Sequence, residues 1–244
     1  MELKIGKKLV GEGHPTFIVA EISGNHDGSI DKAIELIEAA NFAGADAVKL
    51  QTYTADTITI NTNKRDFLLD KDSPWAEFST LWDLYNKAHT PWDWHEALFK
   101  KARELDLEVF SSPFDETAVD FLESLDVPAY KIASPEINHI PLIRKIAQTK
   151  KPVILSTGVS NLEDLKLSIS ELNECGLDEI IVLKCNSTYP APSKEANLRT
   201  IPDIQNQFGV LAGLSDHTIG SLSAIASVAL GASLIEKHIK LDEK

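Results

Sequence analysis

Strand-like apolar segments recur along this chain at the spacing of a (β/α)8 barrel, and each of them ends in chemically competent polar residues. A parallel strand buried on both faces is expected to be apolar throughout, so lysine, glutamate or histidine within it would be costly without partners. Barrel enzymes place their active sites where the carboxyl ends of the strands converge, which accounts for such residues. The polar ends, in chain order, are Glu21, Lys49, Gln51, Ser112, Lys131, Ser134, Ser156, Asn186, Ser187, Ser215, His217, Glu236 and His238.

Helical patterns fill the intervals between these segments. Ser29 opens an amphipathic run that ends at Phe42, with Gly44 just beyond it, as N-cap and C-cap preferences require. Pro91 starts a second run to Leu105, because proline suits a first helical turn. Strand and helix alternate from residue 16 to residue 238, which predicts an α/β TIM barrel of eight parallel strands and seven helices. The other helices are predicted at 115–125, 141–149, 161–175, 198–208 and 218–230.

The connection between the second and third strands is unusually long. Residues 53–90 far exceed the two to six residues of an ordinary βα loop. WAEFSTLWDLY, which contains Trp75, Trp82 and Tyr85, is spaced like a short helix. These aromatic side chains either pack the segment onto the barrel or form part of a lid over the strand ends, and both can hold.

Composition excludes several classes of protein. A length of 244 residues suits one barrel, and the net charge of −13 argues against binding to nucleic acid. No apolar run approaches the ~18 residues of a membrane span, and no secretory signal is visible at the N-terminus. Cys175 and Cys185 are expected at opposite ends of the barrel, so reduced thiols and a cytoplasmic location are expected.

The strand ends suggest two kinds of site. His217 and His238 end adjacent strands and could supply two ligands of a divalent ion, although a lone histidine of this kind is more often structural. Lys49 and Lys131 either form core ion pairs with glutamate or bind an anion together with the nearby serine hydroxyls.

Eight sequence blocks together resemble the N-acetylneuraminate (sialic acid) synthase family. They occur in order through nearly all of the 244 residues. SGNH at residues 23–26 and WDLYNKAHTPWDWH at 82–95 resemble the pseudaminic acid branch of that family rather than the sialic acid branch. The blocks are AEISGNHDGSIDKA, ADAVKLQTY, SSPFDETAVDFL, PAYKIASPE, KPVILSTG, KCNSTYPAP, GLSDHT and IEKHIKL.

The resemblance implies a transferase that condenses phosphoenolpyruvate with an open-chain acetamido sugar and releases phosphate by C–O cleavage. For this branch the sugar would be 2,4-diacetamido-2,4,6-trideoxy-L-altrose. An N-acetylneuraminate or legionaminate synthase, or an inactive barrel that only binds ligand, are the alternatives.

The resemblance also implies roles for individual residues. His217 and His238 would hold Mn2+ or Mg2+, and Glu21 would orient a water molecule or an intermediate hydroxyl. Gln51, Asn25 and Tyr189 would contact the sugar, and either Asn186 or Ser187 would contact the ligand. Phosphoenolpyruvate would be held by Lys49, Ser112, Lys131, Ser134, Ser156 and Ser215.

Only six residues follow His238, so no eighth helix is expected. The resemblance implies a closing part of the barrel and an antifreeze-like domain that crosses to the partner in a homodimer and adds an arginine to the sugar site. Neither falls within residues 1–244, which predicts a truncated TIM barrel with an intact phosphoenolpyruvate half and an incomplete sugar half. An uncovered apolar patch is expected on the outer face of the first and last strands.

Overall fold

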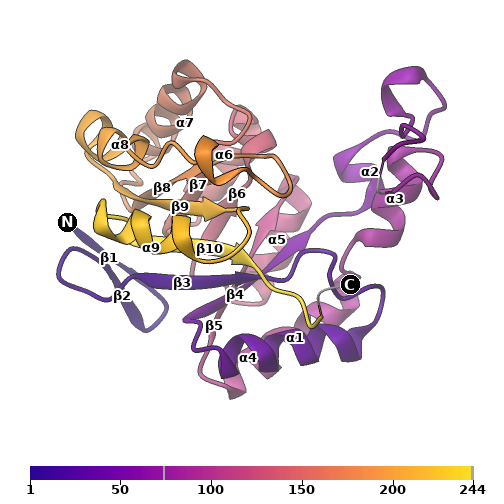
Figure 1. The fold of residues 1–244 in the computed structure, drawn as a ribbon, viewed down its shortest axis with the longest axis horizontal. Helices are drawn as coiled ribbons and strands as arrows, with labels where there is room; N and C mark the ends of the chain where they lie inside the picture. The colour runs from indigo at the N-terminus through magenta and orange to yellow at the C-terminus, as the bar shows by residue number, and fades with distance from the viewer. Residues whose placement is uncertain (74, 243–244) are drawn as a thin grey trace.

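The computed structural model describes residues 1–73 and 75–242 and contains a closed barrel of parallel strands (Figure 1). Neighbouring strands follow one another in sequence, and the last pairs with the first, with His238 beside Glu21. The predicted (β/α)8 architecture is therefore confirmed. The barrel strands are β3 (Phe17–Glu21), β4 (Ala47–Thr52), β5 (Glu108–Pro113), β6 (Tyr130–Ile132), β7 (Val153–Ser156), β8 (Ile180–Cys185), β9 (Leu211–Asp216) and β10 (Leu234–His238).

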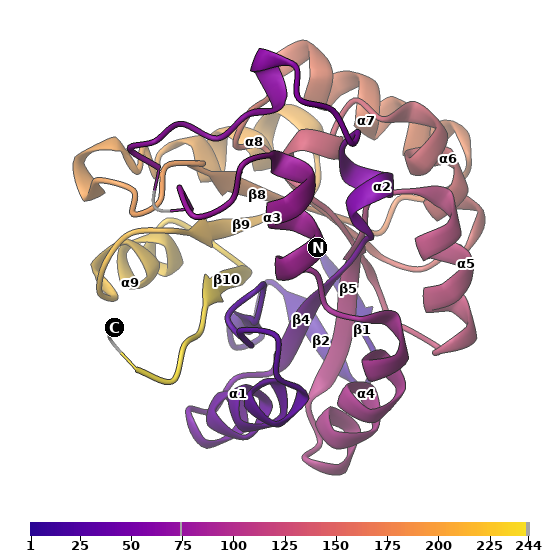
Figure 2. The ribbon, with the colours of Figure 1, turned by 90° about the vertical axis from the view of Figure 1, so that its right-hand side faces the viewer.

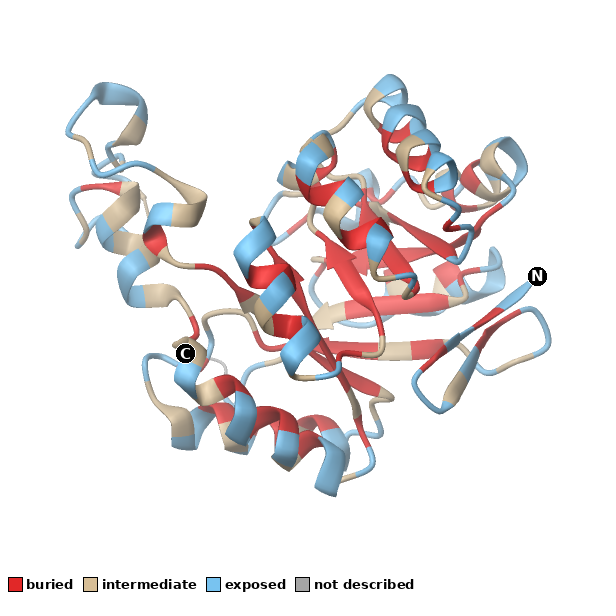
Figure 3. Cartoon of the chain, turned by 180° about the vertical axis from the view of Figure 1, so that it is seen from behind, coloured by how far each residue is buried: buried red, intermediate tan, exposed pale blue. Residues whose placement is uncertain are grey.

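The helices form a ring around the barrel, with their buried sides facing the strands (Figures 2 and 3). The predicted N-cap Ser29 accepts a hydrogen bond from the Lys32 backbone, and Asp115 and Asn161 cap two other helices in the same way. All seven predicted helices are confirmed. They are α1 (Ile30–Phe42), α4 (His95–Glu104), α5 (Glu116–Ser124), α6 (Ile140–Gln148), α7 (Leu162–Glu174), α8 (Thr200–Phe208) and α9 (Leu222–Ala229).

A β-hairpin that the strand pattern did not predict closes the amino-terminal end of the barrel. It consists of β1 (Glu2–Ile5) and β2 (Lys8–Gly11), which pair antiparallel. Leu3, Ile5 and Val10 are buried in one apolar cluster with the inward-facing side chains of the barrel. Because the alternation in LKI and KLV is so short, the segment gives little strand signal. The hairpin therefore closes the interior of the barrel at this end.

The long connection carries two helices at the carboxyl ends of the strands, α2 (Ala55–Ile58) and α3 (Leu81–Ala88) (Figure 2). The helix predicted across 75–85 begins only at Leu81, because Thr80 caps it by accepting from the Asp83 backbone. Trp75 is 51% exposed, so it does not anchor the segment. Tyr85 packs edge-on against Tyr53 of the barrel mouth, with ring centroids 6.0 Å apart. Pro74 of this connection and residues 243–244 lie outside the described residues.

The expected apolar patch on the outer face of the first and last strands is wrong in its location. Ala20 and Ile235 on that face are buried. Exposed apolar side chains lie instead on and just before α9, where Ile219, Leu222 and Ile225 are 80%, 72% and 67% exposed. The segment after β10 runs back toward α1 (Figure 1), and Ile239 packs partly into the core between strands and helices. No helix among the described residues is long and apolar enough to cross a membrane.

Gly213 allows β9 and β10 to approach closely, and this yields a prediction. A Cβ atom at this position would lie 2.1 Å from the Leu234 carbonyl oxygen and 2.8 Å from Leu183 Cδ2. Since backbone cannot move aside cheaply, Gly213→Ala should lower the free energy of unfolding by about 1–3 kcal/mol or more. Urea unfolding followed by circular dichroism measures this.

Gly24→Ala is the matched control, because its added Cβ would meet nothing closer than the Ala88 carbonyl oxygen at 3.3 Å. A Gly213→Ala protein as stable as the parent would contradict the close approach of the two strands.

Candidate functional site

A cavity of about 390 Å3 opens where the carboxyl ends of the barrel strands converge. Every site residue predicted from the strand ends lines it except Asn186, whose neighbour Ser187 does. The structure thus brings together side chains that are up to 217 positions apart in the sequence, from Glu21 to His238. The predicted residues along the wall are Glu21, Lys49, Gln51, Ser112, Lys131, Ser134, Ser156, Ser187, Tyr189, Ser215, His217 and His238.

Lys49 is the centre of a buried charge network on the cavity floor. Its Nζ atom lies 2.6 Å from Glu21 Oε2 and 3.7 Å from Glu236 Oε1, and it donates to Ser112 Oγ at 3.3 Å. Gln51 Nε2 donates to the other oxygen of Glu21 at 3.0 Å. The strand register explains the contact, since Glu21 and Lys49 are direct partners on β3 and β4. The core ion pair considered for Lys49 is therefore confirmed, and the binding of an anion by Lys49 stays a prediction.

The two buried glutamates differ in pKa because the neighbouring lysines offset the effect of burial to different extents. Burial, with help from the negative charge of Glu236, raises the pKa of Glu21 to about 7 although Lys49 opposes the shift. Burial would also raise the pKa of Glu236, but Lys131 and Lys49 outweigh it and hold that pKa below its usual value. Near neutral pH, Glu236 is the ionised partner of the lysines, and Glu21 is poised to exchange a proton.

Lys131 and a row of hydroxyl groups form the adjoining wall. The Lys131 Nζ atom donates to Ser156 Oγ at 2.6 Å and to its neighbour Ile132 O at 3.1 Å. Burial lowers the pKa of Lys131, an effect that Glu236 partly offsets. Ser134 Oγ accepts a hydrogen bond from the Gly158 backbone at 2.8 Å. Cationic groups and hydroxyl donors thus converge on one buried volume, as recognition of an anion requires.

The two histidines lie side by side at the edge of this volume. The ring centroids of His217 and His238 are 5.3 Å apart, and Tyr189 packs on His217 at 4.1 Å. His217 Nδ1 donates to the Asn186 carbonyl at 2.6 Å, which leaves Nε2 for contacts inside the cavity. Burial and the proximity of His217 lower the pKa of His238 to about 4, so His238 is neutral under ordinary conditions.

This corner fits a divalent cation bound through two imidazoles. Glu236 Oε2 is buried beside them without a hydrogen-bond partner, which supplies an unsatisfied negative atom. Within residues 1–73 and 75–242, no three His, Cys, Asp or Glu side chains are grouped to enclose a metal ion. Water or substrate oxygens would therefore complete the coordination, as they do at open catalytic sites.

Gly158 lets the loop after β7 approach the floor of the cavity. An added Cβ atom would lie 2.1 Å from Ser187 Oγ and 2.9 Å from both Cys185 Sγ and Ser134 Oγ.

Burial would raise the pKa of the Cys185 thiol, but His217 and Ser134 lower it to about 7. Cys185 and Cys175 are both free thiols.

Sequence reasoning missed Glu136, which follows β6 on a single 3-10 turn (η3, Ser134–Glu136). Its Oε2 atom is buried without a hydrogen-bond partner. Burial raises the pKa of this carboxyl to about 7, against the opposing influence of its own backbone and of Lys131. A glutamate in the turn SPE gives no sign in the sequence that its carboxylate turns inward. Glu136 directly follows the lining residues Ser134 and Pro135 but does not itself line the cavity.

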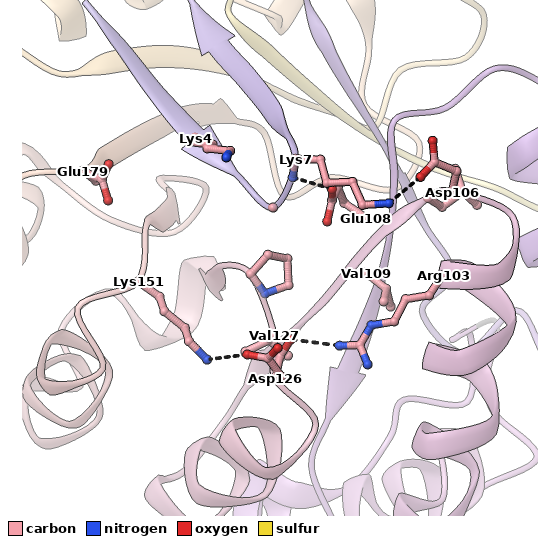
Figure 4. A pocket seen from close by; sticks show the side chains of 13 residues that line it. Lys4, Lys7, Arg103, Asp106, Glu108, Val109, Asp126, Val127, Lys151 and Glu179 are labelled. Atoms are coloured by element: carbon pink, nitrogen blue, oxygen red, sulfur yellow. Dashed lines mark hydrogen bonds and ion pairs between the residues drawn. The ribbon is translucent and has the colours of Figure 1, made fainter.

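A larger pocket of about 570 Å3 lies at the opposite end of the barrel, beside the hairpin (Figure 4). Several of its charged groups have partners within the chain. Lys7 pairs with Asp106 at 2.8 Å, and Arg103 donates to the Asp126 carbonyl at 2.8 Å. The pairs are exposed to solvent, where they contribute little to binding or stability. The candidate site therefore lies at the carboxyl ends of the barrel strands and not in this pocket.

The raised pKa of Glu136 generates a prediction for stability against pH. Because the folded protein holds this proton more tightly, Glu136 stabilises the fold below its ordinary pKa of 4.5, and that contribution is lost as the pH rises through about 7. The free energy of unfolding of the parent should therefore fall by up to about 3 kcal/mol between about pH 5 and pH 8 relative to Glu136→Gln.

Urea titrations of both proteins across this pH range provide the measurement. Parallel pH profiles for the parent and Glu136→Gln would show that the carboxyl titrates normally.

The chain is similar to a family of known proteins. Residues 36–244 match the NeuB family. The chain is 44% identical to the pseudaminic acid synthase of Campylobacter jejuni over 227 residues, and 46% identical to that of Helicobacter pylori over 229 residues. These alignments cover 93% and 94% of this chain. The N,N'-diacetyllegionaminic acid synthase of Legionella pneumophila is 36% identical over 242 residues, which are 98% of this chain and 67% of that protein.

A solved structure shares the fold as well. The spore coat polysaccharide biosynthesis protein SpsE of Bacillus subtilis superposes with a TM-score of 0.85 at 36% identity, covering all of this chain and 65% of that one. The chain spans about two thirds of the length of the curated relatives, 66% and 67% for the two pseudaminic acid synthases. The residues that match the NeuB family, 36–244, include the whole cavity floor except Glu21. The chain belongs to the NeuB family.

Proposed function

We propose that this protein condenses phosphoenolpyruvate with 2,4-diacetamido-2,4,6-trideoxy-L-altrose to form pseudaminic acid and inorganic phosphate. The observation that carries the proposal is the pair of buried lysines, Lys49 and Lys131, at 3% and 2% exposure among the serine hydroxyls of the cavity floor. Two fully buried cations in one cavity are not expected to stabilise the fold, because burying each of them carries a large desolvation cost. Binding of an anionic ligand by both lysines would account for their position in the cavity.

Phosphoenolpyruvate suits this arrangement because it carries a carboxylate and a phosphate on neighbouring atoms. In the proposed complex Lys49 and Lys131 balance these charges, and Ser112, Ser134 and Ser156 donate hydrogen bonds to the oxygens. Ser215 and one of Asn186 and Ser187 complete the proposed set, and the position of Ser187 on the cavity wall favours it over Asn186. The floor holds the donor in a fixed orientation away from bulk water, which is the main way such sites accelerate a reaction.

The proposed reaction forms a bond between C3 of phosphoenolpyruvate and the aldehyde carbon of the open-chain sugar. Water adds to C2, and the bond between C2 and the phosphate oxygen then breaks, so that phosphate leaves with its electron pair. With a pKa of about 7, Glu21 can hold or release a proton at neutral pH while it orients this water. A divalent ion, Mn2+ or Mg2+, held by His217 and His238 would supply Lewis-acid polarisation of the aldehyde.

The two segments that resemble the pseudaminic acid branch pack on one another. His26 of SGNH shares a hydrogen bond with Thr90 at 3.2 Å, and its ring meets Trp94 edge-on at 5.6 Å. Thr90 and Trp94 belong to the second segment that resembles the pseudaminic acid branch. The two branch features are therefore one structural unit, which ties the loop after β3 to the end of the long connection.

The proposal also includes sugar contacts, a homodimer and a cytoplasmic location. Gln51 and Tyr189 line the cavity and are proposed sugar contacts, whereas the Asn25 amide donates to the Ile239 carbonyl at 2.8 Å and ties two loops together. A homodimer whose partner subunit completes the sugar site, and a reducing cytoplasmic setting that suits the two free thiols, are proposed with it. N-acetylneuraminate or legionaminate synthesis is the second candidate function, and it differs only in the sugar.

Phosphate release tests the proposed reaction. Protein incubated with Mn2+, phosphoenolpyruvate and the trideoxy altrose should release phosphate, and N-acetylmannosamine in its place should give little. Turnover with N-acetylmannosamine alone would overturn the assignment of the sugar. Absence of phosphate release with both sugars, together with absence of phosphoenolpyruvate binding, would overturn the reaction class.

A second prediction concerns the metal corner. His217→Ala should lower Mn2+ affinity and phosphate release at least about 10-fold, since loss of one imidazole ligand removes half of the protein's contribution. Calorimetric titration with Mn2+ measures the affinity directly. His139→Ala is the matched control, because His139 lies outside the cavity lining. Unchanged Mn2+ affinity in His217→Ala would refute the ligand assignment.

A further inference from the structure

The mouth of the cavity differs in chemistry from its floor. All the Lys and Glu side chains among the described lining residues, namely Glu21, Lys49, Lys131 and Glu236, are 6% exposed or less and lie on the floor. The exposed lining residues are Pro135, Val159 and Tyr189. Ile58 and Tyr85 are half-buried, as are the polar lining residues Gln51, Ser187, His217 and His238. Val159 and Tyr189 are each 62% exposed. The cavity is therefore charged at the bottom and largely apolar at the opening.

The segment between β4 and β5 supplies part of this apolar mouth. Ile58 is the last residue of α2, and Tyr85 lies on α3, both in the long connection. Tyr85 is held by its edge-on contact with Tyr53, which in turn meets Phe114 at 5.2 Å. Val159 faces the cavity from the loop after β7. The mouth is thus a defined surface built from three separate connections.

The direction of the substrate follows from the reaction. The aldehyde carbon must meet phosphoenolpyruvate on the floor, so the far end of the open sugar chain must point toward the opening. A hydroxyl group placed against Ile58 or Val159 would lose hydrogen bonds to water without replacement, whereas a methyl group would lose none.

We propose that Ile58 and Val159 determine acceptor specificity by binding the apolar end of the sugar, favouring a terminal methyl group over a hydroxymethyl group. This inference rests on the proposed function, since the floor must hold the reacting end. An apolar pocket discriminates against one added hydroxyl by about 10-fold to 100-fold.

Two non-reactive alditols test this specificity. Both carry acetamido groups at C2 and C4, and they differ only in a methyl or a hydroxymethyl group at the terminal carbon. Ligand-observed NMR titration of the protein with excess phosphoenolpyruvate should give tighter binding of the methyl alditol, by about 10-fold or more. Ile58→Asn and Val159→Asn should each reduce this ratio at least about threefold, since an amide can partner the hydroxyl.

Ile60→Asn is the matched control, because Ile60 is in the same segment, is 57% exposed and is absent from the cavity lining. It should leave the ratio unchanged. Equal affinities for the two alditols in the parent, no binding of either, or an unaltered ratio in both mouth variants would overturn the inference. Binding that retains the methyl preference without any phosphate release would instead contradict the proposed function alone.

Discussion

The ion pair between Lys49 and Glu21 is the interaction on which the cavity depends. Both side chains are almost completely buried, and their charged atoms lie 2.6 Å apart. An isolated charge at this depth would be costly, so each group requires the other. The lysine also forms a longer ion pair with Glu236 and donates a hydrogen bond to Ser112. A closed parallel barrel makes this possible, because adjacent strands place Glu21 and Lys49 in direct register at its carboxyl end.

The same network links stability to the proposed chemistry. The floor holds two lysines and two glutamates, so it is close to neutral before a ligand arrives. An incoming anion can then compete with the glutamates for the lysines, and the raised pKa of Glu21 allows it to take up a proton in response. The histidine corner and the apolar mouth line the same cavity as this floor, so the proposed anion, metal and sugar contacts all belong to one site.

Sequence periodicity predicted the barrel and its helices because apolar strands and caps are local signals. The strand-end rule also found most of the floor, since the carboxyl ends of parallel strands must meet. What it missed depends on contacts distant in sequence or on turns. The hairpin at Glu2–Gly11 is too short to show a pattern, Glu136 turns inward from a loop, and the mouth residues Ile58 and Val159 lie on connections. The sequence could not decide between Asn186 and Ser187 because both follow the end of β8, and only the structure places Ser187 on the cavity wall.

The affinity of phosphoenolpyruvate for a protein that lacks one floor lysine tests most directly whether the buried lysines form the proposed anion site. Calorimetry should show binding to the parent and a loss of about 10-fold to 100-fold in Lys131→Met, the equivalent of one charge-assisted hydrogen bond. Lys184→Met is the control, because Lys184 lies on β8 outside the cavity and donates to the Cys185 carbonyl at 2.7 Å. It should bind like the parent. Unchanged affinity in Lys131→Met would contradict the claim that the buried lysines form the anion site.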